Sequence, residues 1–109
     1  MREEAPAVVT CYRRYVIDPD RLQEFEQYPR MIMPLAAKYG GRHHGTFLPY
    51  EGPNNIAIQL FSLPSLAEYE RYRMAVREDE VALAAWRFQT ETRCIISFER
   101  SFMRPVLST

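Results

Sequence analysis

The order of the structural elements is decided by residues 42–68, which read RHHGTFLPYEGPNNIAIQLFSLPSLAE. Residues 42–49 and 55–61 are typical of strands, and the turn-forming residues between them predict that the chain reverses direction at once. Ser65 and Glu68 then match a capping box, in which each side chain bonds the backbone amide of the other residue at the start of a helix. This stretch therefore predicts a strand, a tight reversal, a second strand and a helix.

The sequence before this stretch predicts one further strand and one further helix. Residues 8–17 are rich in β-branched and aromatic side chains and stop at Asp18-Pro19, where the aspartate can cap a helix and proline suits the first turn. The helix should end at Gly40-Gly41. Pro29 and Pro34 are expected to kink or interrupt it, because each removes a backbone donor and crowds the preceding turn.

The sequence after this stretch completes the set of elements. The helix that starts at Ser65 is expected to continue to about Arg77, and a shorter helix should restart at Glu78-Asp79 and run through Phe88. Residues 95–102 are again β-branched and aromatic, so they predict a last strand.

The resulting order, β-α-β-β-α-β, predicts an α+β fold of the ferredoxin-like class, with a four-stranded antiparallel sheet and both helices on one face. Residues 8–106 should form one domain, with a flexible segment at residues 1–7 and a tail at residues 107–109. The first and last strands carry apolar side chains on both alternating sets, so the second face of the sheet should also be covered. We expect a second copy of the chain to cover it, which predicts a homodimer with a space between its sheets.

The composition excludes several classes of partner. Fourteen Lys and Arg balance fourteen Asp and Glu, so neither nucleic acid nor an anionic membrane is an expected partner. The first six residues lack the apolar run of a secretory signal, and no stretch approaches the roughly 18 apolar residues of a membrane span. We therefore expect a cytoplasmic location. Cys11 and Cys94 are expected to be buried free thiols.

Several short stretches, in their order and spacing, resemble those of one protein family. They are Arg13 with Tyr15, Asp18-Pro19, Gly45 within residues 43–47, Glu51-Gly52 with Asn54-Asn55, residues 61–69 with Arg71 and Arg73, and residues 99–105. Together they resemble a NIPSNAP-type member of the dimeric α+β barrel superfamily over residues 9–106. The resemblance implies a ferredoxin-like subunit that dimerises through its sheets. The superfamily contains oxygenases and isomerases as well as plain binding proteins, so the function must be argued from the site.

His43 and His44 are the candidate catalytic residues. Because they are adjacent in a strand, their side chains point to opposite faces and cannot chelate one metal together. One should face the helices and the other the space between the sheets, where an imidazole can act as an acid or base near neutral pH. Gly45 opens room beside His43, which favours that residue. The alternative is a hydrogen-bonded structural pair.

Arg13 and Arg14 lie in the middle of a predicted central strand, where an unpaired charge is costly. At least one of them should have a buried partner or face a wet cavity. Glu99 on the last strand could neutralise either arginine if the strands pair antiparallel. The alternative for Arg13 is to anchor a ligand carboxylate, which suits the planar guanidinium.

The other candidate ligand-binding residues are Tyr12, Tyr15, Tyr50 and Gln59. Together with Tyr69 and Tyr72, these tyrosines could line a pocket for an aromatic or lipid-like ligand, although most tyrosines at strand and helix spacings build cores. The sequence has no glycine-rich phosphate loop and no metal-ligand spacing, so neither a cofactor nor a metal is expected.

Two functions stay open from the sequence. One is a homodimer that binds a small molecule or a protein partner without catalysis. The other is a cofactor-independent oxygenase or isomerase that acts on a small aromatic or polyketide-like substrate, with His43 or His44 as the base. Its substrate would lie between the sheet and the helices or between the two sheets. A closed cavity that brings a histidine and an arginine within hydrogen-bond reach of one ligand-sized space would favour catalysis, and a filled, dry interface between the sheets would argue against it.

Overall fold

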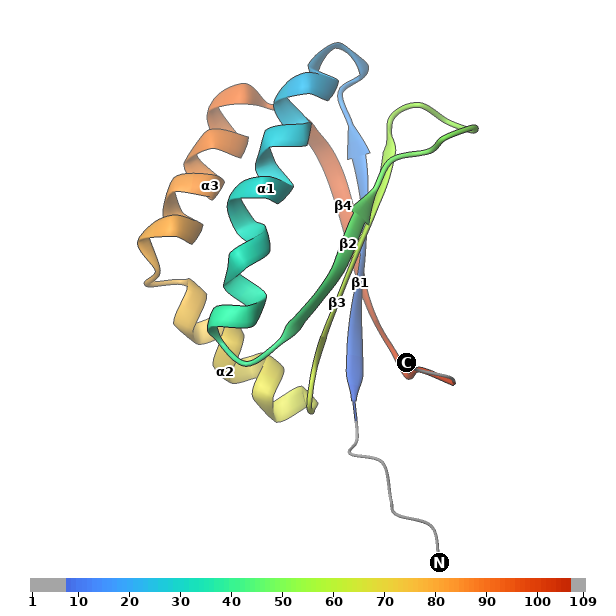
Figure 1. The fold of residues 1–109 in the computed structure, drawn as a ribbon. Coiled ribbons are helices and arrows are strands. Elements are labelled where there is room, and N and C mark those ends of the chain that lie inside the picture. The colour runs from blue at the N-terminus through green and yellow to red at the C-terminus, as the bar shows by residue number, and fades with distance from the viewer. Residues whose placement is uncertain (1–7, 107–109) are drawn as a thin grey trace, which may run out of the picture.

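The fold is a four-stranded antiparallel sheet covered on one face by helices, in a computed structural model that describes residues 8–106 (Figure 1). The sheet has the order β2-β3-β1-β4 and is built from β1 (Val9–Ile17), β2 (Arg42–Phe47), β3 (Ile56–Leu63) and β4 (Ile95–Met103). The helices are α1 (Leu22–Lys38), which follows a short 3-10 turn (Pro19–Arg21), α2 (Leu66–Val76) and α3 (Glu80–Thr92). The predicted ferredoxin-like α+β fold is confirmed. The predicted flexible segment 1–7 and tail 107–109 lie outside the described residues.

The central strand β1 separates two sets of side chains. Arg13 pairs with Gln59 of β3 and with Arg100 of β4, and this row faces the helices. Arg14 pairs with Glu99 one position further along, and because alternate residues of a strand point to opposite sides, that pair faces away from the helices. Adjacent arginines therefore have entirely different surroundings.

The core between the sheet and the helices is largely aromatic. Tyr15 packs against Phe25 of α1, with 5.5 Å between the ring centroids. Cys11 and Cys94 are buried free thiols, as predicted. The main cluster consists of Tyr15, Ile17, Phe25, Tyr28, Ala57, Ala85 and Cys94. This cluster anchors α1 and α3 on the sheet.

Of the kink or interruption predicted for the first helix, the interruption does not occur. Pro29 and Pro34 do not interrupt α1, which continues through both of them to Lys38. Each proline removes one backbone hydrogen bond. The burial of Phe25, Tyr28 and Leu35 along one face of α1 stabilises the helix in spite of that loss.

The predicted break between the second and third helices is confirmed, but the third helix is the longer of the two. Asp79 caps α3 by accepting hydrogen bonds from the amides of Val81 at 2.8 Å and Ala82 at 3.3 Å. Its other carboxylate oxygen accepts from Lys38 Nζ at 2.7 Å and from the Tyr39 hydroxyl at 2.5 Å. One buried carboxylate thus joins the end of α1 to the start of α3.

The start of α2 follows half of the predicted capping box. The Ser65 hydroxyl oxygen accepts a hydrogen bond from the Glu68 amide at 3.1 Å. The Glu68 carboxylate pairs with Arg71, one turn further along the helix. The serine cap is therefore confirmed, and the glutamate stabilises the helix surface instead.

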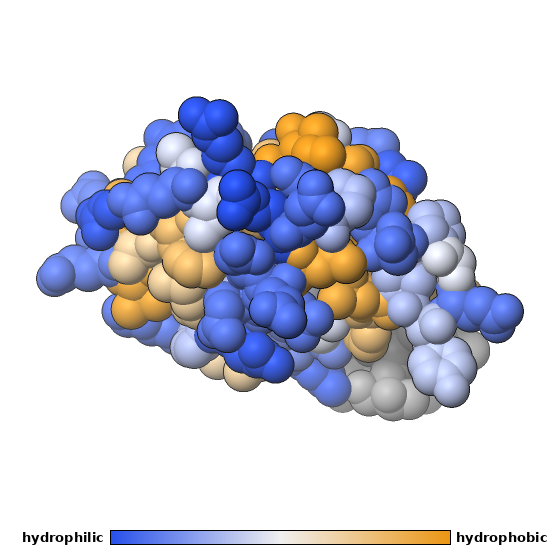
Figure 2. All heavy atoms as spheres, turned by 90° about the horizontal axis from the view of Figure 1, so that it is seen from above, coloured by the Kyte–Doolittle hydropathy of each residue, from blue (hydrophilic) through white to orange (hydrophobic). Residues whose placement is uncertain are grey.

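The surface of the molecule is mixed in character at the end shown in Figure 2. Hydrophilic side chains separate the apolar ones into several groups in this view, so this end carries no single continuous apolar patch among the residues drawn in colour. None of the helices described is long and apolar enough to cross a membrane.

Candidate functional site

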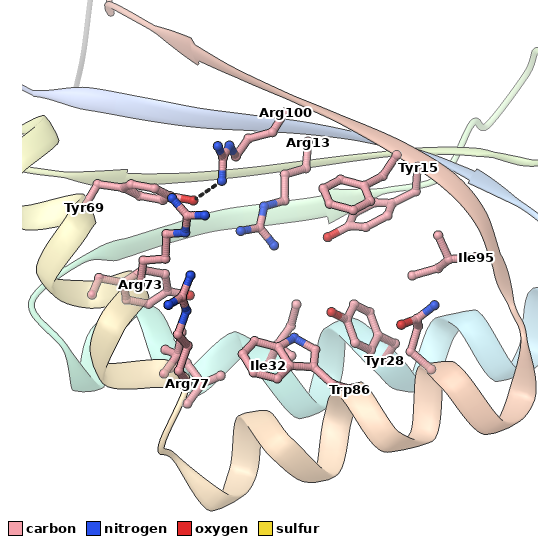
Figure 3. Close-up of a pocket in the computed structure, with 15 residues that line it drawn as sticks. Arg13, Tyr15, Tyr28, Ile32, Tyr69, Arg73, Arg77, Trp86, Ile95 and Arg100 are labelled. Carbon is pink, nitrogen blue, oxygen red and sulfur yellow. Dashed lines mark hydrogen bonds between the residues drawn. The ribbon is translucent and has the colours of Figure 1, made fainter.

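A cavity of about 270 Å³ lies between the sheet and the helices (Figure 3). Strands β1 and β4 form its sheet side, and all three helices contribute side chains to its wall. Three lining residues, Phe98, Arg77 and Arg100, are exposed, so the cavity opens beside them. We call it the arginine pocket because its lining includes Arg13, Arg73, Arg77 and Arg100.

Arg13 is the innermost cation of the pocket. Its Nε atom is buried and has no hydrogen-bond partner within residues 8–106. Its guanidinium carbon lies 5.4 Å from the centre of the Phe61 ring, which gives a cation–π contact but supplies no negative charge. Glu99 pairs with Arg14, at 3.5 Å, on the far face of the sheet. The predicted ion pair thus forms at Arg14, and Arg13 faces the cavity.

The other three arginines come from α2 and β4. Arg73 and Arg77 lie one helical turn apart at the end of α2, and Arg100 lies beside Arg13 in the sheet. Arg100 Nη1 donates a hydrogen bond to the Tyr69 hydroxyl at 3.0 Å. Figure 3 shows the four arginines gathered at one side of the cavity. This side is therefore strongly cationic.

The opposite side of the pocket is mainly aromatic and apolar, with Gln89 of α3 as a polar member of the lining. Figure 3 places Tyr15, Tyr28, Trp86 and Ile95 there. Tyr15 and Tyr28 meet edge to face, with 6.4 Å between their ring centroids. Burial raises the pKa of both hydroxyls above its ordinary value. Both tyrosines therefore stay protonated near neutral pH.

Tyr72, on the wall formed by α2, behaves in the same way. Burial raises its pKa to about 12. Its hydroxyl is therefore a hydrogen-bond donor and not a base at neutral pH.

Gln59 lies behind the pocket lining and contacts one of the lining residues, Tyr15. The Tyr15 hydroxyl donates to Gln59 Oε1 at 3.2 Å, and Gln59 Nε2 lies 3.5 Å from the Thr46 hydroxyl oxygen. Gln59 is almost completely buried. Its contacts hold the Tyr15 ring in place, so Gln59 positions a lining residue and is not itself part of the lining.

The two histidines lie elsewhere. Both line a second cavity, of about 390 Å³, between α1 and β2, beside Phe25 and Glu26. Desolvation, and then the neighbouring His44, lower the pKa of His43. His43 Nε2 is buried without a hydrogen-bond partner among residues 8–106, whereas His44 Nε2 lies 2.7 Å from the Ser62 hydroxyl oxygen. The lining of this second cavity includes Arg30, so the structure brings the histidines together with that arginine and not with Arg13, which lines the arginine pocket.

Two of the candidate ligand-binding tyrosines lie outside the arginine pocket. Tyr12 pairs with Leu60 and Ser101 at a position of β1 that faces away from the helices. Tyr50 lies in the loop between β2 and β3 and is fully exposed. Of the residues that the sequence offered for ligand binding, Arg13, Tyr15, Tyr69 and Tyr72 line the pocket.

Sequence reasoning missed several site residues, among them Tyr28, Arg73, Arg77, Trp86 and Arg100. A signal for Arg100 was present, because a register that sets Glu99 opposite Arg14 also sets Arg100 opposite Arg13. Arg77 follows Arg73 by four residues, a spacing that places two side chains on one face of a helix. The sequence could not show that side chains of α2 line one cavity with those of β1 and β4.

The described residues also bear on metal binding. Within residues 8–106, no group of three His, Cys, Asp or Glu side chains is arranged so that it could hold a metal ion.

The chain is similar to known proteins in its family and in its fold. The profile of the NIPSNAP family matches residues 11–108. A search of curated protein sequences finds no match.

Similar solved structures include a NIPSNAP family protein from Agrobacterium tumefaciens, with a TM-score of 0.79 and 22% identity over 97% of this chain and 92% of that chain. An uncharacterized NIPSNAP-like domain protein from Burkholderia xenovorans has a TM-score of 0.78 and 19% identity over 94% and 88%. A candidate antibiotic biosynthesis monooxygenase from Nitrosomonas europaea has a TM-score of 0.73 and 7% identity over 99% of both chains. At these identities the likeness concerns the fold alone.

Proposed function

The chain belongs to the NIPSNAP family, and from this membership and the pocket geometry we propose that it is a homodimer that binds a small organic molecule without catalysis. The binding site is the arginine pocket. The observation that carries the proposal is Arg13, a cation at the wall of a ligand-sized cavity with no acidic residue in its described lining. A buried charge without a countercharge lowers the stability of the folded protein. Such a cost is expected where the charge binds a ligand of opposite sign.

The lining supports binding more than catalysis. Neither His43 nor His44 lines the arginine pocket, so the oxygenase or isomerase alternative lacks the base assigned to it there. The buried hydroxyls of Tyr15, Tyr28 and Tyr72 have raised pKa values. They can donate hydrogen bonds to a ligand but are poor proton acceptors at neutral pH.

The face of the sheet opposite the helices supports the homodimer. Its apolar side chains include Tyr12 and Val16 of β1, Ile58 and Leu60 of β3, and Phe47 of β2, which is 52% exposed. The helices lie on the other face (Figure 1). A second copy packed sheet to sheet would bury these side chains, as in other two-layer sheet contacts.

The single tryptophan of the chain offers a direct test of binding, because Trp86 lines the pocket. We expect the Trp86 emission to change saturably when phenylacetate is added. Val76→Phe adds a ring to the lining and should raise the dissociation constant obtained from this titration by about tenfold or more. Val81→Phe, on the exposed side of α3, should leave it unchanged.

Thermal unfolding of both variants checks that they fold. If Val76→Phe is unfolded, Ile32→Phe at the opposite wall replaces it. A response that is equal in the wild type and in the folded pocket variant would contradict the proposed site. The absence of any response to phenylacetate, benzyl phosphate and benzyl alcohol would contradict small-molecule binding in this pocket.

A further inference from the structure

The arginine pocket carries a charge imbalance that the chain as a whole does not. Fourteen basic residues balance fourteen acidic ones in the sequence. Four of the basic residues nevertheless line this one cavity, and none of its described lining residues is acidic. A cluster of like charges at a cavity is unfavourable until an anion occupies it.

The neighbouring carboxylates neutralise this cluster only weakly. Arg73 Nη1 lies 3.5 Å from Glu70 Oε1, but Glu70 is exposed and outside the lining. Glu99 faces away from the helices beside Arg14. Arg13 and Arg100 contact aromatic rings and the Tyr69 hydroxyl, which carry no formal charge. The positive charge at this side of the pocket is therefore available to a ligand.

The shape of the pocket restricts the ligand further. The four arginines occupy one side and Tyr15, Tyr28, Trp86 and Ile95 occupy the other (Figure 3). An inorganic anion would contact the first side and leave the second unfilled. A neutral apolar molecule would fill the second side and leave the guanidinium groups unpaired. Only a molecule that has both an anionic group and an apolar part satisfies both sides.

We infer that the ligand is an amphipathic anion, with an oxyanion head held by the four arginines and an aromatic or branched apolar body against the opposite wall. This inference rests on the proposed function and names its ligand class. The planar guanidinium binds carboxylate and phosphate alike through paired hydrogen bonds. Both heads share this chemistry, and the experiment below separates them.

The test compares three probes that share a benzyl body. They are benzyl alcohol, which is neutral, phenylacetate, which carries a carboxylate, and benzyl phosphate. Binding is measured by the emission of Trp86, excited where the benzyl ring does not absorb. We expect the two anions to bind about tenfold or more tighter than the alcohol. The tighter of the two identifies the head. Acetate and inorganic phosphate, which lack the body, should bind more weakly than their benzyl counterparts.

Two pairs of variants locate the head. Arg13→Met should weaken anion binding by about tenfold or more and leave benzyl alcohol unaffected, whereas Arg14→Met, its neighbour on the opposite face, should change neither. The double variant Arg73→Met with Arg77→Met should also weaken anion binding and leave the binding of benzyl alcohol unaffected. Arg71→Met, on the same helix but outside the lining, is its control.

The failures of the two proposals are distinguishable. If benzyl alcohol binds as tightly as the anions, the pocket binds small molecules and the anionic ligand class is wrong. If the anions bind but Arg13→Met and Arg14→Met weaken them equally, the head does not lie at the arginine cluster and the inference is wrong. If none of the probes binds, the proposed function fails together with the inference.

Discussion

In the proposed function, Arg13 serves ligand binding at the expense of stability. Its guanidinium lies at the wall of a cavity, its Nε has no partner within residues 8–106, and its aromatic contacts supply no countercharge. Arg14, the next residue, has Glu99 at 3.5 Å and lies on the other face. The two neighbours therefore differ in what their removal should do.

We expect Arg13→Met to raise the free energy of unfolding of the ligand-free protein by about 1 kcal/mol, because an apolar side chain replaces an uncompensated charge. This corresponds to a rise in Tm of about 4–8 °C. Arg14→Met loses an exposed ion pair, so its stability should change by about 1 kcal/mol or less, and downward. Thermal and urea unfolding measure both variants.

A clear loss of stability in Arg13→Met would contradict this assignment. It would mean that the charge of Arg13 is already satisfied within the folded chain. The same variant should lose its anion affinity, so stability and binding should move in opposite directions.

Among the structural elements, the end of α1 and the start of α3 are joined by the carboxylate of Asp79. Hydrogen bonds from Lys38, then from Tyr39, and then from the amides of α3, keep the pKa of Asp79 well below its ordinary value. The folded protein therefore keeps Asp79 ionised at pH values where the unfolded chain has taken up a proton. This stabilisation is fully present above the ordinary aspartate pKa of about 3.9 and is lost as the pH falls below it.

We expect Asp79→Asn to weaken the acid dependence of stability while keeping the cap of α3, because asparagine caps helices about as well as aspartate. Asp79→Ala removes the cap as well and should lower Tm by about 4–8 °C at neutral pH. Unfolding curves between about pH 3 and pH 7 compare the three proteins. An acid transition that is identical in wild type and Asp79→Asn would show that this carboxylate does not couple the two helices.

The same elements show what the sequence could predict and what it could not. The strands, the serine cap at Ser65 and the break before α3 follow from local patterns, and the structure confirms them. The continuation of α1 through Pro29 and Pro34 could not be predicted from local patterns, because it depends on burial of the helix against the sheet. The pocket could not be predicted from local patterns either, because Arg13, Arg73 and Arg100 come from three separate elements.

For the whole molecule, the two faces of the sheet have separate roles in the proposals. The helices and the arginine pocket lie on one face (Figure 1). On the other face, Tyr12, Ile58 and Leu60 form an apolar surface that a second copy is proposed to cover. The interior of each subunit would then hold the ligand, and the sheets would hold the dimer.

We expect the wild-type protein to sediment as a dimer at micromolar concentration and Leu60→Glu to shift it to the monomer, because the carboxylate would be buried between the sheets. Leu66→Glu, at an exposed position of α2, is the matched control and should remain dimeric. A wild-type protein that sediments only as a monomer would contradict the pairing. A dimer that Leu60→Glu leaves intact would place the contact elsewhere.

The alternation along β1 has a consequence for how such proteins diverge. Cys11, Arg13 and Tyr15 face the helices, whereas Tyr12 and Arg14 face away. A point mutation at one set alters the inner wall and spares the outer surface, so the proposed ligand preference and the proposed subunit pairing could change independently of each other. The insertion of a single residue in this strand would instead exchange the two sets at once. We therefore expect relatives to tolerate substitutions along β1 more readily than a change in its length.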